Sequence, residues 1–137
     1  MRSTKWIGLA VLLLVGLGAA NKLKIKSYAT AEEWRQAADD FVRDGDFDEA
    51  IRAYSWAAEL HKDPALIAEH RQRALSLHVI AHPMTADPKH PRHEERKRLN
   101  AAATEAWRNA GEFGSDGGFH RCSLIRDDLL ALCQMIP

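Results

Sequence analysis

Residues 31–64 decide the fold of this chain and read AEEWRQAADDFVRDGDFDEAIRAYSWAAELHKDP. Apolar side chains recur there at helical spacing, first from about Ala31 to Asp44 and again up to Leu60. A spacing of three and four residues places side chains on one face of an α-helix. The stretch therefore predicts two amphipathic helices. Their stripes are Trp34, Ala37, Ala38 and Phe41 in the first helix, and Phe47, Ala50, Ile51, Tyr54, Ala57, Ala58 and Leu60 in the second.

The ends of both helices carry recognisable signals. Thr30 precedes Glu33 by three residues, which predicts a capping box at the start of the first helix. Gly45 can adopt the positive φ typical of a helix C-terminus, and Asp46 is expected to cap the second helix. Pro64 is expected to stop that helix. The two helices should form an antiparallel hairpin.

The order of these residues resembles the tetratricopeptide repeat, a helical hairpin with a 34-residue period. The resemblance implies helices that stack into a curved array, whose inner groove binds a peptide or another protein. Alanines replace the family's Leu and Gly on the first helix, and Phe and Tyr exchange places. The matching positions are Trp34, Ala37, Ala38, Phe41, Gly45, Asp46, Phe47, Ala50, Tyr54, Ala57 and Pro64.

The same resemblance indicates which side chains would line the groove. Trp56 is an additional candidate because it lies off the apolar stripe of its helix, and exposed tryptophans are enriched at binding hot spots. The alternative is that Trp56 packs under residues 21–30 or against the third helix. The groove positions implied on the first helix are Glu32, Arg35, Asp39, Val42 and Arg43.

Further helices are expected after the hairpin. The third, from Ala65 to about Ala81, has a stripe that includes His70 and Leu77, with Glu69, Arg73 and Ser76 opposite. A proline-rich loop follows, and then a helix over residues 94–113 that includes Trp107. Residues 115–118 are expected to form a turn, and Ser123 to cap a last helix that packs on Trp107. The prediction is an all-α domain over residues 31–137, with about five helices in a tetratricopeptide-like array.

Composition limits the classes of function. The chain has 137 residues, no net charge and 46% hydrophobic residues, which is typical of one small domain. A neutral balance argues against nucleic acid as a partner. The sequence contains no glycine-rich phosphate loop, nucleophile elbow or His-Glu-x-x-His motif. We therefore expect a non-enzymatic protein without a cofactor.

Residues 1–20 are expected to lie outside this fold. Arg2 and Lys5 precede the unbroken apolar run IGLAVLLLVGLGAA, from Ile7 to Ala20. This pattern fits a cleavable secretory signal, with small residues at 18–20 as the cleavage site. It also fits an uncleaved single-pass anchor whose short span is extended by the lysines of the basic connector, residues 21–30. We adopt the anchor, with a periplasmic or secreted protein as the alternative.

Histidines raise a second possibility. His78, His82, His90 and His93 lie close together in sequence, and His120 with Cys122 could join them as ligands of zinc or copper. The alternative is a half-buried His78 with solvated loop histidines.

Cys122 and Cys133 are eleven residues apart, so on one helix they would be too distant for a disulfide.

These observations predict an interaction adaptor or an assembly subunit held at a membrane, with a protein or peptide partner. Two alternatives stay open. One is a histidine-rich metal-binding or redox accessory protein. The other is a structural subunit that contacts a larger membrane complex through its apolar N-terminal helix.

Overall fold

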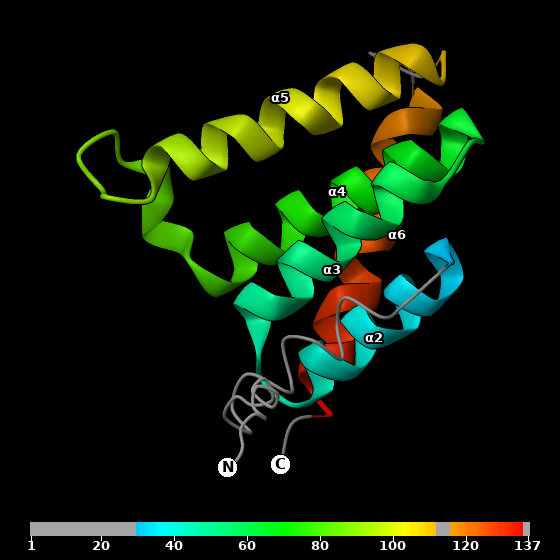
Figure 1. Ribbon diagram of the computed structural model, residues 1–137. Coiled ribbons are helices and arrows are strands. Elements are labelled where there is room, and N and C mark those ends of the chain that lie inside the picture. Colours follow the sequence, from blue (N-terminus) through cyan, green and yellow to red (C-terminus); the bar gives the residue numbers. More distant parts are fainter. Residues whose placement is uncertain (1–29, 112–115, 136–137) are drawn as a thin grey trace, which may run out of the picture.

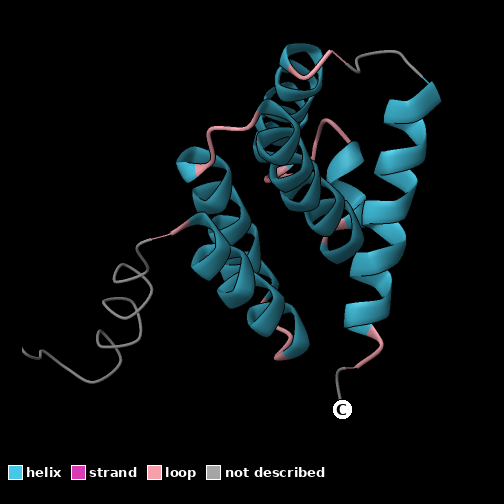
Figure 2. Cartoon of the chain, turned by 90° about the vertical axis from the view of Figure 1, so that its right-hand side faces the viewer, coloured by secondary structure: helices cyan, strands magenta, loops and turns pink. Residues whose placement is uncertain are grey.

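The computed structural model describes residues 30–111 and 116–135, and these form helices and connecting loops without any strand (Figures 1 and 2). The prediction of an all-α domain with about five helices after residue 30 is confirmed. The predicted N-terminal anchor and residues 21–29 of the basic connector lie outside the described residues. The elements are α2 (Ala31–Arg43), α3 (Phe47–Leu60), α4 (Pro64–Ala81), the short 3-10 helix η1 (Pro83–Ala86), α5 (His93–Asn109) and α6 (Asp116–Cys133).

The α2–α3 hairpin forms as its sequence signals indicate, with one exception. The Glu33 N–H donates to Thr30 Oγ1 at 3.1 Å, and the Thr30 N–H donates to Glu33 Oε1 at 3.1 Å, so the capping box is confirmed. Gly45 has φ of 82°, which closes the turn between the helices. Asp46 stands at the N-cap of α3, but its side chain makes no capping hydrogen bond, so that part of the prediction is wrong.

Pro64 begins a helix rather than stopping one. Helix α3 ends at Leu60, and Pro64 is the first residue of α4. The Asp63 carboxylate caps this new helix by accepting from the Ala65 N–H at 3.0 Å. Proline is tolerated at the first helical position because its missing N–H has no intrahelical partner there.

Helix α4 is the centre of the domain and packs against α3, α5 and α6 (Figure 1). Arg73 and Ser76 lie opposite the predicted apolar stripe, yet both are buried, as His70 and Leu77 of the stripe are. This corrects the prediction that the stripe is the buried side of the helix. A helix covered on several sides has no continuous solvent face, so its apolar stripe alone does not identify its buried residues.

One hydrophobic core joins the hairpin to the later helices. Trp107 of α5 lies in the same core as Ile125 and Leu129 of α6. The indole N–H of Trp107 donates to Gln72 Oε1 of α4 at 3.0 Å. In Figure 1, α6 runs behind α3 and α4.

The ends of α5 and α6 differ from the prediction. Helix α5 ends at Asn109, and Gly111 follows with φ of 78°. Helix α6 begins at Asp116, so Gly117 and Gly118 are helical and Ser123 lies inside the helix instead of capping it. Glycine in a helix costs only about 1 kcal/mol, which the packing of α6 farther along can offset.

Candidate protein-binding groove

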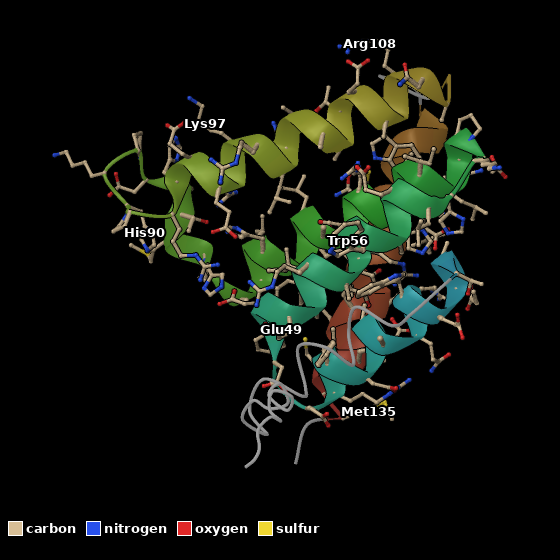
Figure 3. All side chains as sticks on the ribbon, viewed as in Figure 1. Glu49, Trp56, His90, Lys97, Arg108 and Met135 are labelled. Atoms are coloured by element: carbon tan, nitrogen blue, oxygen red, sulfur yellow. The ribbon has the colours of Figure 1, made fainter. Side chains whose placement is uncertain are left out.

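Trp56 is the most prominent apolar side chain of the hairpin surface. It is 53% exposed on α3, and Figure 3 shows it on the face turned to the viewer. Its ring stacks on that of Trp34 in α2, with centroids 5.9 Å apart and an angle of 22° between the planes. Because Trp34 is only 4% exposed, the core holds the inner ring and thereby fixes one face of Trp56.

A groove of about 480 Å³ adjoins Trp56. Helices α3 and α5 form its walls, and α4 contributes Arg71 between them. A volume of this size accommodates several side chains of a peptide. The lining residues are Ile51, Arg52, Ser55, Trp56, Glu59, Arg71, Glu95, Arg98, Leu99 and Ala102.

Ion pairs fix most of the charged side chains of the groove. Arg71 of α4 binds Glu59 of α3, and this pair joins the two helices. Arg52 binds Glu49 one turn earlier on α3. Arg98 of α5 differs, since it is exposed and its side chain makes no ion pair or hydrogen bond within residues 30–111 and 116–135.

A polar cluster fixes the beginning of α5 against the beginning of α3. Arg92 Nη2 donates to Asp48 Oδ1 at 2.9 Å, and Arg92 Nε donates to Glu95 Oε1 at 2.9 Å. His82 Nε2 lies 3.0 Å from the same Asp48 oxygen. The hydrogen bonds from Arg92 lower the pKa of Asp48 to about 2, with a smaller contribution from His82, and Arg92 also lowers the pKa of Glu95. Both carboxylates are therefore ionised and already paired at neutral pH.

The five α2 residues expected to line a groove do not line this one. Trp56 alone of the six predicted side chains lines the groove between α3 and α5. Val42 is fully buried in the core. On the surface of α2, Arg35 pairs with Glu32 at 3.5 Å, and Arg43 pairs with Asp40 at 2.8 Å.

Asp39 belongs to a network that crosses the domain. The Tyr54 hydroxyl of α3 donates to Asp39 Oδ1 at 2.6 Å. The Arg73 guanidinium of α4 lies 5.8 Å from the centre of the Tyr54 ring. Burial raises the pKa of Tyr54, and the hydrogen bond to Asp39 adds to this, so the hydroxyl remains a donor. Asp39 thus holds α2 to α3.

The four clustered histidines do not converge on one point. His78 is fully buried, with its ring centroid 5.2 Å from that of His82. His93 Nδ1 lies 2.8 Å from the Thr85 carbonyl oxygen, and His90 Nδ1 accepts from the Arg92 N–H at 3.0 Å. In the part of the chain that the structure describes, no three His, Cys, Asp or Glu side chains are grouped so that they could hold a metal ion.

Both cysteines lie on α6, as the spacing argument requires. Cys122 and Cys133 are half-buried, pack against the core and are not joined by a disulfide. The prediction that these two thiols do not bond to each other is confirmed.

The predicted membrane anchor, residues 7–20, lies outside the residues that the structure describes. None of the helices between residues 30 and 135 that the structure describes has the length and apolarity needed to cross a bilayer. The run from Ile7 to Ala20 is not among them.

Comparisons with models of protein families, with curated proteins and with solved structures find no match to this chain.

Sequence reasoning found one residue of the groove, Trp56, and missed the rest of its lining. Trp56 could be identified because it departs from the apolar stripe of its helix. No local sequence pattern marks Arg98, Leu99 and Ala102 as groove residues. They line the groove only because α3 and α5 both pack on α4.

Proposed function

We propose that this protein is a non-catalytic adaptor or assembly subunit that binds a partner protein or peptide in the groove between α3, α4 and α5. Exposed Trp56, held against Trp34 at the edge of this groove, is the observation that carries the proposal. A tryptophan whose ring is already fixed loses little conformational entropy on binding, and tryptophans dominate the energetics of many interfaces.

The helical array is proposed to be tetratricopeptide-like. The support is the spacing of residues 31–64 together with the α2–α3 hairpin, whose Gly45 turn lies where that pattern places it. The binding surface proposed here differs from the one expected by resemblance, because the groove is lined by α3 and α5 rather than by α2.

We further propose that the apolar residues 7–20 anchor the protein in a membrane, so that its partner belongs to a membrane complex. The sequence of that run and the lysines that follow it support this proposal. Intact mass of the protein from the membrane fraction tests it. A species that retains Met1 is expected, and a soluble species that begins near Asn21 would contradict the anchor.

Site-specific photo-cross-linking in the source cells tests the proposed groove. A photoreactive phenylalanine derivative replaces Trp56 in the full-length protein, and a control protein carries it at Asp44, an exposed residue of the α2–α3 turn. Discrete protein adducts are expected from position 56 and not from position 44. Absence of such adducts, or the same adducts from both positions, would overturn the groove as the binding site.

The partner identified by mass spectrometry then allows a quantitative measurement. Trp56→Ser should weaken binding of that partner by at least tenfold, since truncation of a hot-spot tryptophan costs about 2 kcal/mol or more. Unchanged affinity would show that Trp56 lies near the partner without contributing to binding.

A further inference from the structure

Some charged side chains of the groove have ion-pair partners and one does not. Its two carboxylates are both bound to arginines, because Glu59 pairs with Arg71 and Glu95 pairs with Arg92. Arg98 has no such partner within the described residues. The groove therefore presents an unpaired cation to a ligand, while both of its carboxylates are already paired.

Arg98 lies beside the apolar part of the groove. Leu99 follows it in α5, and Ala102 is one turn farther along the same helix face. Ile51 and Trp56 face them from α3. An apolar side chain that enters between these walls would bring its neighbours in sequence next to the Arg98 guanidinium.

We propose, on the basis of the function proposed above, that the groove recognises an acidic protein segment in which an Asp or Glu lies next to a large apolar side chain. The apolar side chain packs on Trp56, Ile51 and Leu99, and the carboxylate accepts hydrogen bonds from Arg98. Arginine binds carboxylates through two parallel N–H donors, which fixes the orientation of the segment as well as its charge. A basic segment finds no unpaired carboxylate in this lining.

Selection from a library of random displayed peptides tests this specificity on the full-length protein in detergent. Peptides that bind the native protein should share an acidic residue adjacent to Trp, Phe or Leu. The affinity of a selected peptide should fall at least tenfold with Arg98→Glu at an ionic strength of about 0.15 M, and a selection repeated on that variant should favour Lys or Arg in place of the acidic residue.

Lys97→Glu is the matched control. Lys97 is the neighbouring residue of α5, is exposed and does not line the groove, so this variant has the same net charge as Arg98→Glu. Its peptide affinity should stay within about twofold of the native value, because exposed charges outside a contact are largely screened. Circular dichroism of both variants checks that the helices are retained.

The outcomes separate the two proposals. Peptides whose binding requires Trp56 but lacks any acidic preference, or equal losses with Lys97→Glu and Arg98→Glu, would overturn the acidic specificity and leave the groove function standing. A selection that yields no Trp56-dependent peptide would overturn both.

Discussion

Arg73 and Asp128 are joined across 55 residues of sequence by a contact of 3.0 Å between Nη2 and Oδ2. Arg73 is 5% exposed and also binds Glu69 at 3.3 Å through Nε. Burial opposes the charge on Arg73, but the hydrogen bond with Asp128 and the nearby Glu69 carboxylate outweigh it and raise the pKa of the guanidinium. This ion pair is a specific polar link between α4 and α6.

Removing the charge of Asp128 should loosen α6. Asp128→Asn weakens a charge-assisted hydrogen bond, and because the carboxylate is partly exposed we expect a cost of about 1 kcal/mol in the local stability of α6. Cys122 and Cys133, the two cysteines of the chain, both lie on α6 and report its opening. Their rate of labelling by a thiol reagent should rise about fivefold.

Asp127→Asn is the control for this experiment. Asp127 is adjacent on α6 and contacts only its neighbour Arg126, at 3.6 Å, among the ion pairs of the described residues. Labelling of the cysteines should be unchanged in this variant. Equal acceleration by both substitutions would show that the Arg73 contact does not hold α6.

The two stacked tryptophans should contribute differently to stability. Trp34→Ala removes a core side chain that is 4% exposed, and the resulting cavity should lower the free energy of unfolding by about 3 to 5 kcal/mol. Trp56→Ala removes an exposed ring and should cost about 1 kcal/mol or less. Chemical denaturation followed by circular dichroism compares them, and equal losses would contradict the assignment of Trp56 to the surface.

The turn of the hairpin requires a backbone conformation that favours glycine. Gly45 has φ of 82°, and a Cβ added there would meet nothing within 4 Å, so any cost of substitution is conformational. Gly45→Ala should lower the free energy of unfolding by about 1 kcal/mol. Gly45→Asn, which tolerates positive φ better, should recover part of this loss in the same denaturation experiment. Equal stability of the native protein and the alanine variant would indicate that the turn relaxes.

Acid should destabilise the domain below about pH 6.5. Burial lowers the pKa of His78, although Glu95 opposes the shift, and burial also lowers the pKa of His70. Below the unfolded pKa of about 6.5, the unfolded chain therefore binds protons that the folded chain does not. The free energy of unfolding is highest above that pH and decreases as the pH falls, by at most about 1.4 kcal/mol per pH unit for each histidine.

Denaturation at several pH values between 5 and 7 measures this dependence. His78→Gln should reduce the slope of unfolding free energy against pH, whatever its effect on absolute stability. The exposed His120 provides the control, and His120→Gln should leave the slope unchanged. A slope that is the same in all three proteins would show that His78 titrates normally in the fold.

Sequence patterns predicted those features of the helices that depend on interactions between residues close together in the chain. Thr30 and Glu33 satisfy each other within one turn, and the Gly45 turn depends on its own φ, so both could be read from adjacent residues. The start of α6 could not, because Asp116, Gly117 and Gly118 resemble a turn until the packing of the whole helix is taken into account.

Some residues of the candidate site could likewise be predicted from the sequence and others could not. Trp56 departs from the period of its own helix, and that departure is visible without the fold. Val42 and Arg73 are buried because other helices cover them. The sequence prediction therefore assigned Val42, a core residue, to a surface groove. It also assigned Arg73 to the side of α4 opposite the buried stripe.

The sequence by itself determined that residues 31–60 form a capped helical hairpin with a tryptophan outside its apolar stripe, because helical period, caps and turns depend on residues within a few positions of one another. Only the tertiary structure decided that α4 is central, that Asp128 neutralises Arg73, and that Arg98 and Leu99 face Trp56. Those relationships join helices far apart in the chain, and which helix faces meet is set by the packing of the entire core rather than by any local pattern.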